Sequence, residues 1–187
     1  MATPKAPRPP SPPRRYITTS SPGGSTFTPH SPTPPCLAVQ DGSSLFHLAW
    51  VADHDSPSGK PSLTNEVDVK QYDAYAQSPP GIVNPRGTTL RVIDMAPACE
   101  APMHRTVSLD YAVVLIGNVK LTLESGEERV LAPGDVCIQR GTGHAWRNES
   151  ATEWARMLFC VMACEPVVVE GEELGEYMLG EGKESLS

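Results

Sequence analysis

The stretch that decides the fold runs from Ala98 to Ser150 and holds two polar clusters joined by a hairpin. The first cluster reads ACEAPMHRTVSLDYAVVLIG (98–117) and the second reads APGDVCIQRGTGHAWRNES (132–150). Between them, VKLTLESGEERVL (119–131) alternates apolar and polar residues on both sides of a Ser-Gly turn. This pattern is typical of a β-hairpin. The hairpin is therefore expected to carry the second cluster back towards the first.

Polar residues of the first cluster recur at every second position, as His104, Thr106, Ser108 and Asp110. Side chains two apart in a strand share one face, and the apolar Val107 and Leu109 occupy alternate positions here. The four polar side chains are therefore expected to project together, into solvent or into a pocket. In a pocket, Thr106 and Ser108 become candidates for binding substrate.

The second cluster leaves an apolar Val-Cys-Ile strand, turns at RGTG, and presents His144, Trp146 and Asn148 two residues apart. Trp146 is a candidate for the wall of the cavity or for the core, and Asn148 for fastening the turn. Arg140 is a candidate for holding a substrate carboxylate or enolate oxygen through its planar guanidinium. An outward surface ion pair is the alternative for Arg140.

The two clusters resemble the signature motifs of the cupin superfamily, which are small antiparallel β-barrels with an intermotif hairpin. His104, Asp110 and Gly117 fit the first motif, whereas Thr106 stands where a second histidine is expected. The residues that fit the second motif are Gly134, Gly141, His144 and Asn148. Arg140 lies in the region of the motif's proline, and the segment is one residue short. HRTVSLDY followed by QRGTGHAWRN is similar to single-domain cupins frequent in bacteria and in fungal natural-product pathways.

The resemblance implies an all-β fold, a cupin-type antiparallel β-barrel (a double-stranded β-helix, jelly-roll-like) over residues 36–170. An acidic tail follows at 171–187, where we expect one short helix around 172–178 and then a frayed end. Residues 66–77 fit a short helix or an edge strand equally well. By resemblance we also expect a homodimer.

Residues 1–35 hold eleven of the twenty prolines and four basic residues, with no acidic residue. Such a segment buries too little apolar area to offset its ordering entropy. We expect a disordered or extended Pro-rich arm.

Charge and composition narrow the partners. The formal net charge of -7 becomes -11 for residues 16–187 once the four basic residues of the arm are removed, so nucleic acid is an unfavourable ligand. The chain has no apolar run of the roughly 18 residues that a membrane span needs, and no apolar core of a secretory signal. Five cysteines without a Cys-x-x-Cys pair indicate free thiols in a reducing compartment. We therefore expect a cytoplasmic protein that binds neither nucleic acid nor membranes.

By the resemblance, His104, Asp110 and His144 are the candidate ligands of one divalent metal ion. Two imidazoles and a carboxylate suit Fe(II), and similar sets hold Zn, Mn or Ni. The alternative is a metal-free pocket in which the histidines act as general acid and base, with Asp110 orienting an imidazole. His47, a polar residue in an apolar strand, and Arg156 are further candidates for contact with substrate.

Three functions remain open from the sequence. The leading one is a small-molecule enzyme of natural-product (polyketide-type) metabolism, a metal-assisted lyase or isomerase that works through enolisation by decarboxylation, dehydration, isomerisation or cyclisation. The catalytic set is then His104, Asp110, His144 and Arg140. The second is an Fe(II)-dependent oxygenase, and the third is a non-catalytic ligand-binding cupin. The natural-product context comes from the resemblance alone.

Overall fold

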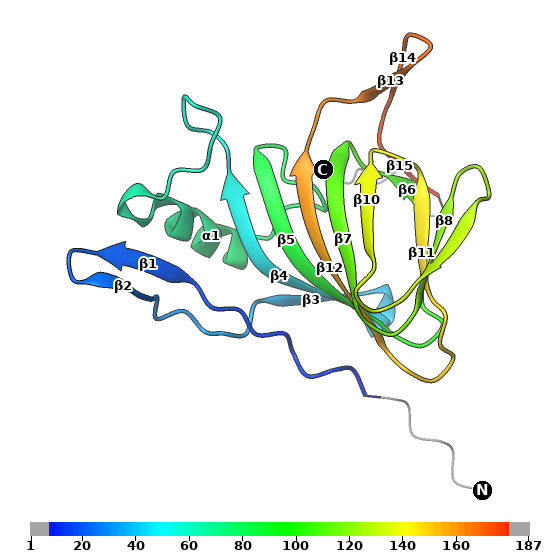
Figure 1. Ribbon diagram of the computed structural model, residues 1–187, viewed down its shortest axis with the longest axis horizontal. Helices are drawn as coiled ribbons and strands as arrows, with labels where there is room; N and C mark the ends of the chain where they lie inside the picture. The colour runs from blue at the N-terminus through cyan, green and yellow to red at the C-terminus, as the bar shows by residue number, and fades with distance from the viewer. Residues whose placement is uncertain (1–7, 180–187) are drawn as a thin grey trace, which may run out of the picture.

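A computed structural model describes residues 8–179 and confirms the expected all-β, antiparallel class (Figure 1). The large sheet is six-stranded, in the order β10-β7-β12-β5-β4-β3. Its strands are β3 (Cys36–Val39), β4 (Ser44–Asp53), β5 (Gly87–Met95), β7 (Ser108–Ile116), β10 (Val136–Arg140) and β12 (Ala155–Ala163).

The small sheet is five-stranded, in the order β15-β6-β11-β8-β9. Its strands are β6 (Glu100–Arg105), β8 (Val119–Leu123), β9 (Glu128–Leu131), β11 (His144–Asn148) and β15 (Tyr177–Met178). No hydrogen-bonded ladder joins the two sheets within residues 8–179, so the expected barrel takes the form of two packed sheets. The intermotif hairpin is formed as predicted, by β8 and β9.

The core between the sheets comes from residues that alternate along the strands of both. Val114 of β7, Val119 of β8 and Met157 of β12 are fully buried, and Trp146 of β11 packs with them. Burying an aliphatic side chain of this size contributes about 1.5–3 kcal/mol. Burial of these apolar side chains fixes the orientation of each strand, and so determines which polar residues of the same strand also face the space between the sheets.

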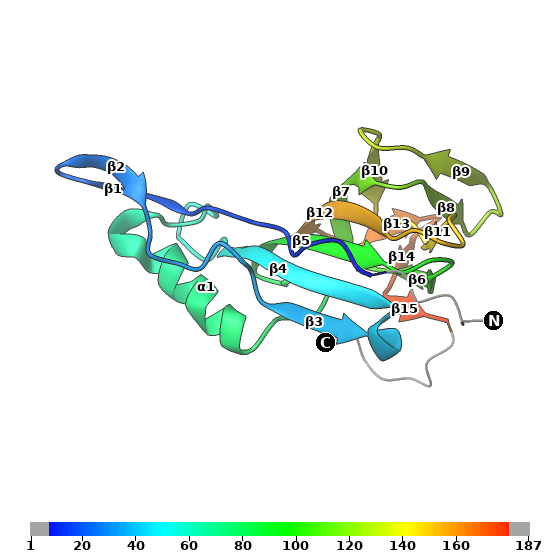
Figure 2. The ribbon, with the colours of Figure 1, turned by 90° about the horizontal axis from the view of Figure 1, so that it is seen from below.

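The remaining elements lie at the margins of the two sheets (Figures 1 and 2). They are the hairpin β1 (Thr18–Ser21) and β2 (Gly24–Phe27), the 3-10 turns Gln40–Gly42 and Thr64–Glu66, the helix α1 (Val67–Gln77), and the hairpin β13 (Val167–Val169) and β14 (Glu172–Leu174). Within residues 8–179 no helix has the length and apolarity needed to cross a membrane.

Helix α1 resolves the ambiguity at 66–77 and anchors the Pro-rich arm. Its Tyr72 is 1% exposed, stacks on Trp50 at 4.7 Å and donates a hydrogen bond to the Leu48 carbonyl. Arg15 of the arm donates to the Tyr72 hydroxyl at 2.8 Å. The described part of the arm, residues 8–35, is thus extended and carries a hairpin. Residues 1–7 lie outside the described range.

The prediction of a short helix at 172–178 is wrong. This segment forms β14 and β15, and β15 pairs with β6 through Tyr177↔Arg105 and Met178↔His104. Gly175 interrupts the segment, and the free edge of β6 offers backbone hydrogen bonds that an isolated helical turn cannot match. Residues 180–187 of the predicted tail are not described, and the division into arm, barrel and tail at residues 35 and 170 stays a prediction.

Asn148 fastens the end of the second motif, as predicted. Its side-chain nitrogen lies within 3.1 Å of the carbonyls of Met95, Ala96 and Glu153, and its oxygen accepts from the Ser150 amide. The residue is 1% exposed.

We predict that Asn148→Ala lowers the free energy of unfolding by about 2–4 kcal/mol, because it leaves buried carbonyls without donors. Urea denaturation followed by tryptophan fluorescence measures the change. The matched control Asn118→Ala, at an exposed position, should stay within about 0.5 kcal/mol of wild type. Equal losses in the two variants would contradict the anchoring role.

Candidate functional site

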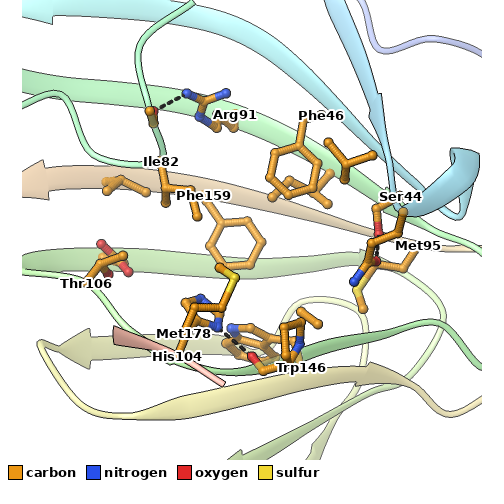
Figure 3. A pocket seen from close by; sticks show the side chains of 18 of the residues that line it. Ser44, Phe46, Ile82, Arg91, Met95, His104, Thr106, Trp146, Phe159 and Met178 are labelled. Carbon is orange, nitrogen blue, oxygen red and sulfur yellow. Dashed lines mark hydrogen bonds between the residues drawn. The ribbon is translucent and has the colours of Figure 1, made fainter. Parts of the chain in front are cut away.

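A cavity of about 460 Å³ opens between the two sheets (Figure 3). Its wall is mostly apolar and is contributed by both sheets and by the loop before β5. Apolar residues of this wall include Leu37, Phe46, Ile82, Ile93, Phe159 and Met178. The chemistry-bearing side chains of the wall are Arg91, His104, Thr106, Asp110, His144 and Trp146. A small polar set in an apolar cavity is typical of a site for a small organic ligand.

His104 and His144 meet because β6 and β11 are neighbouring antiparallel strands in which these two residues are paired. Their ring centroids are 4.2 Å apart. His104 Nδ1 lies 2.8 Å from the Pro102 carbonyl, and His144 Nδ1 lies 2.9 Å from the Thr142 carbonyl. A carbonyl only accepts, so each Nδ1 carries the proton and each Nε2 keeps its lone pair.

Gln139 links His144 to Asp110. Its side-chain nitrogen donates to His144 Nε2 at 2.8 Å and to Asp110 Oδ2 at 3.3 Å. Gln139 on β10 is paired with Asp110 on β7, so their side chains stand side by side on the inner face of the large sheet. His104 Nε2 has no hydrogen-bond partner among residues 8–179 and is the free basic nitrogen of the cluster.

Burial sets the protonation states of the site. It lowers the pKa of His144 to about 3, helped by the neighbouring His104 and opposed by the Thr142 carbonyl. Burial also lowers the pKa of His104. The same desolvation raises the pKa of Asp110 to about 6, against the Ser108 hydroxyl. At neutral pH the site therefore holds two uncharged imidazoles and a carboxyl group that can gain a proton in mildly acidic solution.

Three buried polar atoms of the cluster lack a partner within the described chain: Asp110 Oδ1, Gln139 Oε1 and Trp146 Nε1. Thr106 and Ser108 are satisfied by each other, at 2.8 Å between hydroxyl oxygens. Buried groups left unpaired in this way carry a desolvation cost that a bound polar ligand can offset. The polar face predicted from the first motif is thus buried, and Thr106 lines the cavity whereas Ser108 lies behind it.

Three predicted site residues lie away from this cavity. Arg140 is exposed, because its neighbour Gln139 takes the inward position on β10. His47 and Arg156 both bind the fully buried Asp94, at 3.1 Å from His47 Nε2 and 2.8 Å from Arg156 Nη2. None of these three residues lines the cavity, and their expected contact with substrate stays an untested prediction.

Two residues of the site, Arg91 and Gln139, escaped the sequence analysis of function. Arg91 lies on β5 in TTLRVIDM, where it reads as a polar residue of an alternating strand. Gln139 directly precedes Arg140, and only the inward parity of β10 distinguishes the two. Counting positions from Asp110 across the β7–β10 pair would have found Gln139, but the pairing register itself was needed.

The side chains do not fit the metal site that the sequence predicted. No three His, Cys, Asp or Glu side chains converge as a metal-binding group in the part of the chain that the structure describes. Gln139 contributes to this, because its N–H groups occupy the Nε2 lone pair of His144, which a metal ion would need, and one of the two oxygens of Asp110. The other oxygen, Asp110 Oδ1, stays unpaired. The expected face of His104, Asp110 and His144 is therefore replaced by a hydrogen-bonded cluster.

These pKa shifts make stability depend on pH with opposite signs. As the pH falls from 7 to 5, an unfolded chain protonates His144 near its ordinary pKa of 6.5, whereas the native state does not, so stability is lost. Native Asp110 takes up its proton near 6, before the unfolded group at 3.8, so stability is gained.

We predict that His144→Gln removes about 2 kcal/mol of the wild-type stability loss between pH 7 and 5, and that Asp110→Asn deepens the loss by about 1 kcal/mol. Urea titrations at both pH values measure the two differences. Identical pH dependence in wild type and both variants would show that neither group is perturbed by folding.

Comparison with known proteins places this chain among fungal biosynthesis proteins. It is 44% identical over 164 residues to phomopsin biosynthesis cluster protein D of Diaporthe leptostromiformis, covering 87% of this chain and 85% of the relative. It is 39% identical over 170 residues to oryzines biosynthesis cluster protein J of Aspergillus oryzae, covering 90% and 92%. It is 36% identical over 152 residues to the cupin-domain-containing oxidoreductase fogC of Aspergillus ruber, covering 74% and 75%.

No family model matches the sequence. Among solved structures, the cupin domain of Schizosaccharomyces pombe Cnp3 is similar with a TM-score of 0.49 and 11% identity, covering 82% of this chain and 90% of that one. The polyketide cyclase RemF of Streptomyces resistomycificus is similar with a TM-score of 0.45 and 14% identity, covering 80% and 77%. On the strength of the fungal relatives and of the two motifs that build its cavity, the chain belongs to the cupin superfamily, in a group with proteins of fungal biosynthesis clusters.

Proposed function

We propose that this cupin is a small-molecule enzyme of fungal secondary metabolism that transfers protons on an oxygenated organic substrate. The reaction class is enolisation-driven: decarboxylation, dehydration, isomerisation or cyclisation of an acid, a ketone or an aromatic intermediate. The observation that carries the proposal is the pair of uncharged imidazoles, 4.2 Å apart, on an otherwise apolar cavity. The biosynthesis-cluster relatives support the metabolic setting.

His104 is the general base of this proposal. Its Nδ1–H is held by the Pro102 carbonyl, and its Nε2 lone pair is free of partners in the described chain. Removal of a proton from the carbon next to a substrate carbonyl leaves an enolate and a protonated His104. The Pro102 carbonyl stabilises that imidazolium, which offsets part of the desolvation that lowers the pKa of His104.

Asp110 is the partner that exchanges the proton on the other side of the reaction. Its pKa, raised by burial to about 6, lies close to neutrality, where a group both gives and takes a proton efficiently. Delivery of a proton to a second carbon completes an isomerisation, and delivery to a leaving hydroxyl completes a dehydration with release of water. The unpaired Trp146 Nε1–H supplies a donor for a substrate oxygen, and the unpaired Gln139 Oε1 supplies an acceptor for a substrate hydroxyl.

Deuterium exchange tests the proposed proton transfer without knowledge of the natural substrate. Purified protein is incubated in ²H₂O with a panel of cyclic ketones and β-keto acids, and loss of the α-proton signal is followed by NMR. We predict exchange above the buffer rate with at least one ketone, and a fall of about 10²–10⁴-fold in His104→Gln. His54→Gln, which alters a histidine bound to Thr88 outside the cavity, is the matched control. Exchange that is equal in His104→Gln and wild type would reject the general base.

An oxidoreductase is the second candidate, because one relative that is 36% identical is named a cupin-domain-containing oxidoreductase. This function requires an electron acceptor or donor, which proton transfer does not. Oxygen uptake or a change in nicotinamide absorbance with the same panel of ketones would favour it over the proton-transfer proposal. A non-catalytic ligand-binding role predicts ligand binding without any of these signals.

Metal-assisted chemistry, as the sequence predicted it, requires Gln139 to release His144 and Asp110. We predict that Gln139→Glu binds Zn²⁺ at least about tenfold more tightly than wild type, because a carboxylate would replace the N–H groups that now occupy the ligands. Isothermal titration of Zn²⁺ into both proteins measures this difference. If wild type binds one Zn²⁺ as tightly as Gln139→Glu or more tightly, Gln139 moves aside for the metal ion, and a metal-assisted reaction becomes the better proposal.

The homodimer and the cytoplasmic location expected from the sequence stay predictions. Light scattering of the full chain at micromolar concentration tests the first, and a fluorescent fusion tests the second.

A further inference from the structure

The cavity holds a buried cation that no motif accounts for. Arg91 of β5 lines the wall and is 5% exposed. One terminal nitrogen, Nη2, donates to the carbonyls of Pro80 and Gly81, at 3.0 and 2.7 Å. These bonds hold the loop before β5 against the cavity, where its Ile82 joins the wall.

The other donors of Arg91 are unpaired. A guanidinium has five N–H groups, and the two carbonyls occupy Nη2 only. Nε is buried without a partner, and Nη1 has no hydrogen bond to any residue between 8 and 179. No carboxylate in this part of the chain forms an ion pair with Arg91, and desolvation lowers the pKa of its guanidinium. The two arginines that the structure does pair with buried carboxylates, Arg86 and Arg156, show how the chain satisfies such a charge elsewhere.

The residues around Arg91 indicate which kind of ligand could accept hydrogen bonds from its unpaired N–H groups. Phe46, Ile82 and Phe159 lie near it in the cavity, and Phe159 separates it from His104 and Met178 in the view of Figure 3. Asp110 is the acidic residue of the described cavity wall, and it belongs to the histidine cluster. An apolar chamber with a charged donor at one position and a base at another fits an amphipathic anion.

The register of the large sheet gives the backbone spacing between Arg91 and Asp110, the proton-exchanging carboxyl group of the histidine cluster. Arg91 on β5 pairs with Phe159 on β12, and Asp110 on β7 pairs with Val161 of the same strand. One strand therefore separates the Arg91 strand from the Asp110 strand, which places their backbones about 10 Å apart. A one- or two-ring organic molecule spans such a distance between its acidic group and its reacting carbon.

We propose that Arg91 is the anion-binding residue of this cavity, and that its ligand is a largely apolar organic acid with a single carboxylate. Its role as a substrate-positioning residue rests on the proton-transfer function proposed above, whereas binding of the anion does not. A phosphate is a poor fit, because it carries more charge and Arg91 has no second cation beside it in the cavity wall. A carboxylate accepts the N–H groups that the loop carbonyls leave free and neutralises the guanidinium.

Two probes of the same shape test the inference on the full chain: 2-naphthoate, which carries the carboxylate, and methyl 2-naphthoate, which does not. We expect wild type to bind the acid about tenfold or more tightly than the ester at pH 7.5, by isothermal titration. In Arg91→Gln the acid should lose about tenfold or more, while the ester stays within about twofold. Arg129→Gln, at an exposed arginine of β9, should leave both affinities unchanged.

Three outcomes would overturn the proposal: equal binding of acid and ester to wild type, absence of 2-naphthoate binding up to millimolar concentration, or an equal loss of both probes in a folded Arg91→Gln protein. If Arg91→Gln does not fold, the comparison of acid with ester on wild type still decides. His104→Gln separates this inference from the proposed function, because it should abolish deuterium exchange and retain the preference for the acid. If wild type prefers 2-naphthoate over its ester but catalyses no deuterium exchange, the proposed enzyme function is rejected and the anion site is kept.

Discussion

The cross-strand pair of His104 and His144 is the constraint on which the site depends. The two residues belong to different motifs, forty positions apart in the chain, and become neighbours only through the β6–β11 register. A shift of that register by one residue would turn one imidazole to the opposite face of the small sheet. The backbone carbonyls of Pro102 and Thr142 then fix each ring by its Nδ1–H, so that both present Nε2 away from their own strands.

Burial of this pair determines its chemistry. Because the cavity is apolar, charging either imidazole is unfavourable, and the same environment holds a proton on Asp110 to an unusually high pH. Groups with pKa values displaced in opposite directions are typical of sites that exchange protons. Gln139 couples the acid to one histidine while filling the positions that a metal ion would need. Residues that match a metal-binding motif by spacing are therefore not enough to leave the ligand lone pairs free, because a neighbouring side chain can take them.

Buried charges on the two faces of the large sheet are satisfied in different ways. Arg91 points inward and keeps unpaired donors, whereas Asp94, three residues later on β5, binds His47 and Arg156 on the other face. Arg156 also donates to the Ser11 carbonyl of the extended arm at 2.8 Å, so the arm lies over this outer cluster. The outer charges satisfy one another and the arm, whereas the inner charge of Arg91 meets two backbone carbonyls and no carboxylate in the described chain. The outer cluster around Asp94 therefore stabilises the fold, whereas Arg91 keeps donors that a ligand could use.

Two-residue alternation and local turn chemistry determined the intermotif hairpin and the shared polar face of the first motif, and the sequence also indicated the fastening role of Asn148. The resemblance to cupins implied the all-β class, whereas the structure decided that the polar face points into a cavity and not into solvent. The sequence alone could not place His47, Arg140 or Arg156, since alternation shows which residues of a strand share a face but not which of the two faces meets the cavity. It also could not reveal Gln139 or Arg91 as parts of the site. Their importance arises from partners on other strands and from what remains unpaired there, and only the tertiary structure brings those atoms together.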